Sequence, residues 1–255
     1  MTQITIGEVD LAVAEGIGVL TLNAPDRRNA LTPGLVSDIV AAADWLESRD
    51  DVGVVIVTGA GSAFCAGAAL TELDSANASV LRGIYEAFLR IYNLPLPTIA
   101  AVNGPAVGAG LNLAMACDLR LVSEEAVLDS RFLRIGLHPG GGASWLLRQA
   151  AGSELTSAML LFGLRFTGAE CVAKGLAWDC VPQADLLPTA RNLASQAAGA
   201  PTELTSLVKQ TLKDTWGLSH AETLELELDR QAWTATQPWY GQSRAAARTP
   251  ERGAR

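Results

Sequence analysis

The pattern of apolar and polar positions divides the chain into a first half that mixes strands with helices and a second half that is mainly helical. Short β-branched runs around a glycine-bearing turn predict a hairpin over residues 4–22. Continuous apolar runs predict further strands, buried on both faces because they do not alternate with polar residues. These runs cover residues 54–57, 98–102, 119–122 and, more briefly, 126–128.

Helical spacing of the apolar residues connects these strands. A helix is predicted over residues 33–48, with Thr32 as its N-cap and Pro33 at its first position. Further helices are predicted over residues 80–91 and up to about residue 117, and beyond residue 142 only 178–181 has a strand pattern. Strands that alternate with helices indicate βα units with parallel pairing, so the predicted fold class is α/β.

Three regions follow from this pattern. We expect a β/α core over residues 1–195, a helical assembly region over 196–240 and a basic, mobile tail over 241–255. The helices of the second region carry more apolar residues than one helix pair needs for its own core, which favours association with other copies. These residues are Leu204, Leu207, Val208, Leu212, Leu224, Leu226, Leu228 and Trp233.

Composition narrows the function classes. Of the 255 residues, 49% are apolar and 18% are charged, which excludes a disordered chain. The net charge of −8 argues against nucleic-acid binding, which depends on basic side chains that neutralise phosphates. No apolar run reaches the roughly 18–20 residues that span a bilayer, and the first ten residues do not resemble a signal peptide.

Cysteine and histidine usage points to a cytoplasmic protein without a metal centre. The four cysteines form no C-x-x-C pair, and a disulfide framework is not expected in a chain of this size and apolar content. We therefore interpret them as reduced, mostly buried thiols in a cytoplasmic protein. The two histidines, His138 and His220, lie far apart in the sequence, so we predict no metal site.

Two loops share one composition, in which a buried strand runs into small residues and then into a helix. They cover residues 59–67 and 103–110. Exposed N–H groups at such positions can form an oxyanion hole, although small residues also simply permit tight packing. A dinucleotide site is the competing interpretation, but the third glycine of G-x-G-x-x-G would fall at Phe64.

Five motifs in a fixed order make a more specific signal. They are residues 28–31 (RNAL), 63–68 (AFCAGA), 101–110 (AVNGPAVGAG), 113–118 (LAMACD) and 136–142 (GLHPGGG). In this series the sequence resembles the enoyl-CoA hydratase/isomerase (crotonase) family over about residues 4–215. The resemblance implies a spiral of ββα units, a C-terminal helical region that builds trimers or dimers of trimers, and acyl-CoA or enoyl-CoA as ligand.

The resemblance also implies positions for the ligand. The thioester oxygen would accept hydrogen bonds from the backbone N–H groups of Ala68 and Ala109. Coenzyme A would follow the loop that contains Arg27, Arg28, Ala66 and Leu70, with either arginine available to its phosphates. No separate cofactor is expected, because the coenzyme A thioester is itself the substrate.

The family's acid and base positions carry residues that do not titrate. The two glutamates that hydratases use correspond to Asn112 and Phe132, and the aspartate of some isomerases and hydrolases corresponds to Gly140. Hydration needs one group to activate water and another to deliver a proton, so the usual mechanism is hard to sustain. His138 is the histidine available as a substitute, with a backbone-bonded loop histidine as the alternative.

Other polar residues near these motifs have ordinary explanations. Asp129 and Arg131 are better interpreted as a salt bridge at a strand end than as substrate contacts, and Tyr85 as a packing residue. Three functions stay open. The first is an acyl-CoA-binding protein of fatty-acid metabolism with lost or unorthodox hydratase chemistry. The second is an active hydratase or isomerase that uses groups such as His138, and the third is a non-catalytic acyl-CoA carrier or regulator.

Overall fold

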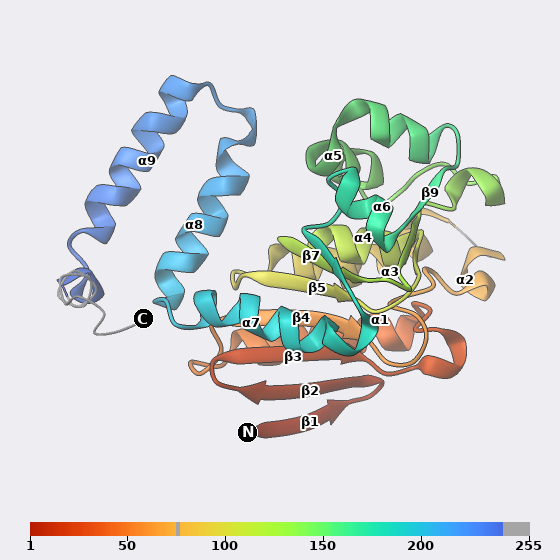
Figure 1. Ribbon diagram of the computed structural model, residues 1–255, viewed down its shortest axis with the longest axis horizontal. Coiled ribbons are helices and arrows are strands. Elements are labelled where there is room, and N and C mark those ends of the chain that lie inside the picture. The colour runs from red at the N-terminus through yellow and green to blue at the C-terminus, as the bar shows by residue number, and fades with distance from the viewer. Residues whose placement is uncertain (75–76, 242–255) are drawn as a thin grey trace. The chain divides into compact units, whose positions relative to one another are not determined.

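The computed structural model describes residues 1–74 and 77–241 (Figure 1). It divides into two compact units, Met1–Gly199 and Ala200–Arg255. The sequence-based boundary between residues 195 and 196 falls inside helix α7 (Leu186–Ala198). Of the predicted tail, residues 242–255 lie outside the described part of the chain.

The first unit is built on a seven-stranded sheet in the order β1-β2-β3-β4-β5-β7-β10. Strands β1 to β3 form an antiparallel meander, which confirms the predicted N-terminal hairpin, and the strands from β3 to β10 are parallel. The strands are β1 (Thr2–Ile6), β2 (Val9–Ala14), β3 (Ile17–Leu22), β4 (Val54–Gly59), β5 (Thr98–Val102), β7 (Leu119–Ser123) and β10 (Asp179–Val181).

Helices cover both faces of this sheet (Figure 1). Helix α1 (Pro33–Glu47) packs on β2 and β3, with α3 (Ala78–Asn93) and α4 (Ala109–Ala116) beside it, while α7 packs on the other face. The predicted start of α1 is confirmed, since the Thr32 side chain accepts a hydrogen bond from the Leu35 amide at 3.2 Å. Layers of helix and parallel sheet bury the central strands on both sides, as their unbroken apolar runs predict.

A second, three-stranded sheet has the order β6-β8-β9, with β6 (Ala106–Val107), β8 (Val127–Asp129) and β9 (Arg165–Thr167). The expectation of continuous helix through this part of the second half is wrong at β9. Residues 165–167 are too few to show an alternating pattern, and their pairing with β8 arises only in the folded chain. Helix α5 (Ala143–Leu160) precedes β9, and α6 (Gly168–Ala173) follows it. The 3₁₀ turns are η1 (Pro25–Arg27), η2 (Phe132–Ile135) and η3 (Gln183–Asp185), and the short helix α2 (Leu70–Asp74) follows the first small-residue loop.

The second unit contains the helices α8 (Thr202–Asp214) and α9 (His220–Thr234), joined through η4 (Thr215–Gly217). Arg230 of α9 forms an ion pair with Asp214 and donates to the Thr211 hydroxyl at 2.7 Å, which holds the two helices together. Both helices carry large apolar side chains that are about half exposed. These include Val208, Leu212, Leu224, Leu228 and Trp233.

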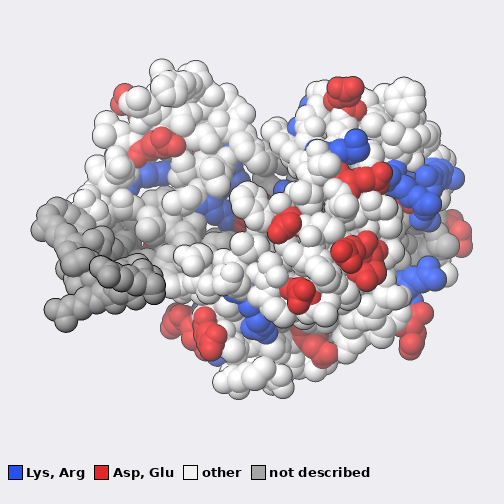
Figure 2. Space-filling view, in the orientation of Figure 1, with Lys and Arg blue, Asp and Glu red and all other residues white. Residues whose placement is uncertain are grey.

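Two surface properties complete the description. Across residues 1–74 and 77–241, each helix is too short or too polar to cross a bilayer. Among the described residues on the face shown in Figure 2, acidic and basic side chains form small separate patches and no continuous basic band.

Candidate functional site

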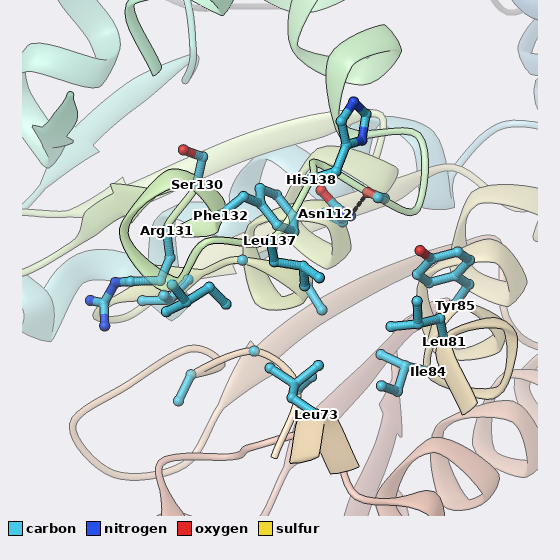
Figure 3. A pocket seen from close by; sticks show the side chains of 18 residues that line it. Leu73, Leu81, Ile84, Tyr85, Asn112, Ser130, Arg131, Phe132, Leu137 and His138 are labelled. Carbon is cyan, nitrogen blue, oxygen red and sulfur yellow. Dashed lines mark hydrogen bonds between the residues drawn. The ribbon is translucent and has the colours of Figure 1, made fainter. Parts of the chain in front are cut away.

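A pocket of about 130 Å³ lies where the small-residue loops meet α3 and the segment after β8 (Figure 3). One side, which we call the loop wall, consists of residues 66–68 and 107–109. The opposite side, which we call the side-chain wall, consists of Asn112 and residues of the segment 130–140. Leu81, Ile84 and Tyr85 of α3 lie together at one end of the pocket, and Ser130 and Arg131 lie at the other.

The loop wall is held together by backbone contacts. The Cys65 amide donates to the Pro105 carbonyl at 3.2 Å, and the Val107 amide donates to the Cys65 carbonyl at 3.0 Å. Gly67 has a φ of +93°, and a Cβ there would lie 2.5 Å from the Val107 carbonyl oxygen. Only glycine permits this conformation together with so close an approach of the two loops. The small residues therefore allow the two loops to pack closely against each other, and this contact places both loops in one wall of the pocket.

Two backbone amides on this wall are available to a ligand. Ala109 is the first residue of α4, where an amide has no acceptor inside its own helix. Ala68 forms a parallel β-bridge with Leu31. In this bridge the Leu31 amide donates to the Gly67 carbonyl and the Ala69 amide donates to the Leu31 carbonyl, so the amide of Ala68 itself faces away from the bridge. Within the described residues neither amide donates a hydrogen bond, and both residues line the pocket. Two such donors on one wall can stabilise a developing oxyanion.

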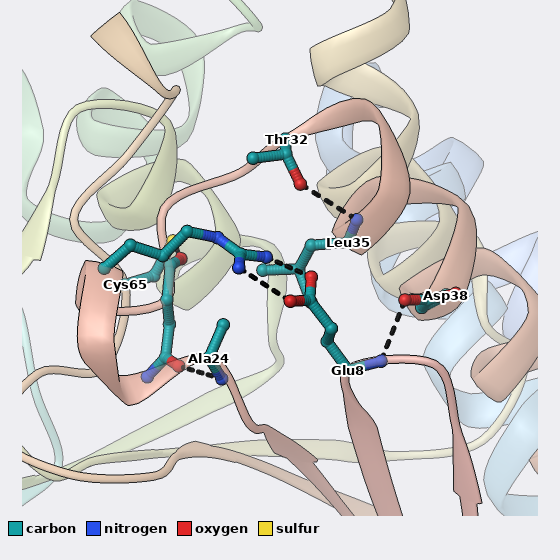
Figure 4. Close-up of polar contacts among 8 residues, drawn as sticks. Glu8, Ala24, Thr32, Leu35, Asp38 and Cys65 are labelled. Carbon is teal, nitrogen blue, oxygen red and sulfur yellow. Dashed lines mark hydrogen bonds and ion pairs between the residues drawn. The ribbon is translucent and has the colours of Figure 1, made fainter.

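Asn29 supports the first of these loops from behind. Its side-chain oxygen accepts from the Ala24 amide at 2.9 Å (Figure 4), and its side-chain nitrogen lies within 3.2 Å of the carbonyl oxygens of Ala60, Ala63 and Phe64. Asn29 is fully buried and has a φ of +55°, a conformation that asparagine tolerates better than most residues. The loop geometry thus depends on one side chain that the motif RNAL contains.

Cys65 lies in the same loop but is not a candidate nucleophile. Its thiol is buried and donates to the Asn29 carbonyl at 3.1 Å. Burial raises the pKa of the Cys65 thiol to about 12, which keeps it protonated at neutral pH. The interpretation of Cys65 as a packing residue agrees with this environment.

The side-chain wall brings Asn112, Phe132 and Gly140, the positions that the resemblance implies for the acid and base groups, to one pocket. Asn112 is buried and donates to the Gly140 carbonyl at 3.0 Å, as the dashed line in Figure 3 shows. Phe132 is buried at the start of η2. A Cβ at Gly140 would lie 2.3 Å from the Tyr85 hydroxyl oxygen, so that hydroxyl occupies the space of any side chain at position 140. None of Asn112, Phe132 and Gly140 can exchange a proton at neutral pH.

His138 also lines the pocket, but it is exposed. Its Nδ1 lies 2.8 Å from the Pro139 carbonyl oxygen, and in Figure 3 its ring points away from Leu137 and Phe132. Tyr85, which the sequence suggests as packing, presents its hydroxyl to the pocket beside Gly140. No sequence signal identifies this role, because it depends on α3 lying against the loop after η2.

Arg131 is held at the opposite end of the pocket by Asp129. The Asp129 carboxylate is buried and accepts from the Arg131 amide at 2.8 Å and from its Nε at 3.1 Å. The ion pair predicted at this strand end is thereby confirmed, with Arg131 in a left-handed conformation at φ +59°. Arg131 lines the pocket as well as an adjoining cavity.

The adjoining cavity, of about 410 Å³, contains part of the predicted coenzyme A contact set. Arg28 and Ala66 line it together with Arg131 and Arg165. Arg27 instead forms an ion pair with Glu8, and the hydrogen bond from Arg27 lowers the pKa of the Glu8 carboxyl (Figure 4). Leu70 is the first residue of α2, directly after the loop wall.

The pocket therefore contains six of the residues that the sequence predicts for the site. The two predicted arginines lie apart from each other, since Arg27 pairs with Glu8 and Arg28 lines the adjoining cavity. The six are Ala66, Ala68, Ala109, Asn112, Phe132 and His138. Among residues 1–74 and 77–241, histidine, cysteine and carboxylate side chains form no group of three or more that could hold a metal ion.

Comparison with known proteins identifies relatives of this arrangement. The family model described as enoyl-CoA hydratase/isomerase matches residues 12–242. The chain is 42% identical over 248 residues to the probable enoyl-CoA hydratase EchA14 of Mycobacterium tuberculosis, covering 93% of this chain and 96% of that protein. It is 31% identical to the 1,2-epoxyphenylacetyl-CoA isomerase of Escherichia coli over 85% of this chain and 84% of that enzyme.

Solved structures share the fold. An enoyl-CoA hydratase subunit I from Geobacillus kaustophilus superposes with a TM-score of 0.88 at 26% identity, covering 97% of this chain and 98% of that one. An enoyl-CoA hydratase from Polaromonas sp. JS666 gives a TM-score of 0.87 at 28% identity, covering 93% and 95%. The predicted α/β fold class and the resemblance are confirmed by these matches. With its small-residue loops on one pocket wall and a family match over nearly its whole length, the chain belongs to the enoyl-CoA hydratase/isomerase family.

Proposed function

We propose that this protein binds acyl-CoA and enoyl-CoA thioesters, with the thioester oxygen between the amides of Ala68 and Ala109. The observation that carries the proposal is the loop wall, where two residues that line one pocket have amides with no acceptor among the described residues. Negative charge that develops on the oxygen of an enolate or a tetrahedral carbon would be stabilised there. The apolar lining of Leu81, Ile84 and Phe132 suits an aliphatic acyl group.

The coenzyme A part is proposed to lie in the adjoining cavity. Arg28, Arg131 and Arg165 line that cavity and can pair with phosphate oxygens. Ala66 borders both cavities, which gives the ligand a continuous path from phosphates to thioester. Arg27 is excluded from this role because its guanidinium is engaged by Glu8.

The proposed chemistry is enolate stabilisation with weak or absent hydration. A hydratase moves two protons, one from water and one to the acyl carbon. Asn112 donates to the Gly140 carbonyl, and Phe132 contributes a buried apolar side chain to the lining. We therefore expect tight thioester binding and slow addition of water.

Calorimetry with butyryl-CoA, a saturated and unreactive ligand, tests the proposal. Saturable binding by the wild-type chain supports it, and the Arg28→Ala variant should weaken binding of the coenzyme A ester. Absence of both heat and a thermal shift at high ligand concentration would overturn it. Arg49→Ala offers a matched control, since it removes an arginine that lines neither cavity.

An active isomerase or hydratase that uses other groups is the second candidate. The hydroxyl of Tyr85 beside Gly140 and the ring of His138 at the rim favour it, because both are groups that can carry a proton. A non-catalytic carrier would not turn over crotonoyl-CoA, and this absence of turnover would distinguish it from an active hydratase or isomerase.

We also propose that the protein is cytoplasmic and assembles into trimers, alone or paired. In the described part of the chain, none of the four cysteines forms a disulfide, which suits a reducing compartment. The half-exposed Leu212, Leu228 and Trp233 of the second unit supply an apolar surface for association. Light scattering of the intact chain should report a trimer or hexamer, and a monomer at micromolar concentration would contradict this assembly.

A further inference from the structure

Glu8 lies at the turn between β1 and β2 and connects three separate segments of the first unit. Its amide donates to the Asp38 carboxylate of α1 at 2.9 Å, and its carbonyl accepts from the Asn23 amide at 2.7 Å. Its carboxylate accepts from both terminal nitrogens of Arg27 in η1, one of these contacts measuring 2.6 Å (Figure 4). Because its amide and its carbonyl are both engaged, Glu8 offers Arg27 an acceptor with a fixed position.

The ion pair between Glu8 and Arg27 fixes a direction more than it adds stability. The side chains of Arg27 and Glu8 are 37% and 38% exposed, and exposed ion pairs contribute little to the free energy of folding. A guanidinium that meets a carboxylate through two hydrogen bonds is nonetheless held in one orientation. The pair should therefore act on the position of η1 and of the residues that follow it.

The next residue, Arg28, has a strained backbone. Arg28 and Asn29 both have a φ of +55°, in the left-handed region. Asparagine tolerates this region, whereas for arginine it is costly and persists only where surrounding contacts enforce it. The Arg28 amide donates to the Pro25 carbonyl and its own carbonyl accepts from the Ala66 amide, both at 2.9 Å. The conformation of Arg28 is thus enforced by η1 on one side and by the loop wall on the other.

The two left-handed residues direct their side chains to different places. Asn29 is buried and donates to the Ala63 carbonyl at 2.9 Å, whereas Arg28 is exposed and lines the adjoining cavity. Among residues 1–74 and 77–241 the Arg28 guanidinium has no hydrogen-bond or ion-pair partner. Its place at the cavity therefore depends on the backbone that carries it.

We propose that Glu8 is a positioning residue for coenzyme A, which acts by holding Arg27 and thereby the backbone of Arg28, so that the Arg28 guanidinium stays at the adjoining cavity. This inference rests on the proposed function, in which that cavity receives the phosphates of coenzyme A. Without the Glu8 carboxylate, η1 loses its anchor and Arg28 relaxes toward ordinary backbone conformations. The dissociation constant then rises in inverse proportion to the fraction of molecules in which Arg28 keeps its binding conformation.

The sign of one substitution tests the inference. Glu8→Gln removes a negative charge and releases Arg27, so attraction between charges alone predicts tighter binding of an anionic ligand. Positioning predicts the opposite result. The dissociation constant for butyryl-CoA, measured by calorimetry on the full chain, should rise about threefold or more, as when the binding conformation falls to a third of the molecules. S-butyryl-pantetheine, which lacks the phosphates, should bind Glu8→Gln as it binds the wild type.

A double-mutant cycle shows whether the effect passes through Arg28. Arg28→Ala should weaken butyryl-CoA binding by about tenfold or more, the value of a hydrogen bond between charged groups. Glu8→Gln should then cause no further loss in the Arg28→Ala background, because the residue that it positions is absent. If Glu8→Gln does not fold, Arg27→Lys, which keeps the charge but loses the paired hydrogen bonds, should raise the dissociation constant in the same way.

Asp51→Asn provides the matched control. It also removes one carboxylate that forms an ion pair with an arginine, Arg49, and it raises the net charge by the same amount as Glu8→Gln. Neither Asp51 nor Arg49 lines the pocket or the adjoining cavity. The dissociation constant for butyryl-CoA should therefore equal that of the wild type.

The outcomes separate this inference from the proposed function. A wild type that binds butyryl-CoA, with Glu8→Gln binding it as tightly or more tightly, overturns the positioning role and leaves the proposed function standing. A loss in Glu8→Gln that is equally large in the Arg28→Ala background, or that S-butyryl-pantetheine shares, also overturns the positioning role. A wild type that binds neither ester overturns the proposed function itself.

Discussion

The two walls of the pocket present different chemical groups, although Ala109 of one wall and Asn112 of the other both belong to α4. The loop wall presents backbone amides, and its geometry is set by Gly67, Gly108 and the buried Asn29. The side-chain wall presents Asn112, Phe132 and the bare backbone of Gly140. Under the proposed function the loop wall stabilises charge on a thioester, whereas the side-chain wall offers little to move a proton. The proposal therefore treats charge stabilisation and proton transfer as separable properties of one pocket, because backbone and side chains would supply them independently.

The largest effect on turnover is expected when carboxylates are introduced into the side-chain wall. Asn112→Glu combined with Phe132→Glu should raise crotonoyl-CoA hydration by about 10²–10⁴-fold, the usual contribution of general acid–base catalysis. Phe132→Glu alone is the control, since it leaves the contact between Asn112 and Gly140 intact. Fast hydration by the unmodified chain that is lost in His138→Ala would contradict the expected slow turnover.

A smaller effect is expected from removing the support of the loop wall. Asn29→Ala leaves the Ala24 amide and up to three carbonyls without their buried partner, so unfolding in urea should show a loss of about 3 kcal/mol or more. Asn29→Asp keeps the acceptor for Ala24 but sets a carboxylate oxygen against the same carbonyls in place of the N–H donor, so it should lose at least as much stability. Equal stability of Asn29→Ala and the wild type would show that the loop does not depend on this residue.

Removing one amide tests the loop wall directly. Ala109 is the first residue of α4, a position that favours proline, so Ala109→Pro deletes the N–H and preserves the helix. Binding of butyryl-CoA should weaken by about 1–3 kcal/mol, the range for losing a hydrogen bond at a buried site. Ala109→Gly retains the amide and should bind like the wild type. Unchanged affinity in a folded Ala109→Pro variant would remove Ala109 from the proposed oxyanion contact.

The last effect is a dependence of folding stability on pH at alkaline pH. The pKa values of the Cys65 and Cys171 thiols are raised by burial from 9.0 to about 12 in the folded chain. Above pH 9 the unfolded chain loses these protons first, so folding stability is full below pH 9 and falls as pH rises toward 12. Each thiol contributes a slope of about 1.4 kcal/mol per pH unit. Chemical unfolding from pH 8 to 10.5 should show this decline, and Cys65→Ala should reduce it; an identical slope in that variant would exclude Cys65 as a cause.

Much of the fold was determined by local pattern. The apolar runs of β4, β5 and β7 and the capped start of α1 are visible in the sequence because buried parallel strands and helix caps have strong local signatures. The five ordered motifs likewise identified the family. The strand β9 and the helix α2 were not predicted, since segments of three and five residues are too short for periodicity to identify them.

The site required the tertiary structure. The sequence determined which residues stand at positions 68, 109, 112, 132 and 140, but only folding brought residues up to 72 positions apart to one pocket. Folding also decided that Arg27 pairs with Glu8 while Arg28 lines a cavity, and that the Tyr85 hydroxyl lies beside Gly140. These roles depend on contacts between segments distant in the chain, and no local pattern of hydrophobicity, propensity or spacing specifies which distant side chain a residue will meet.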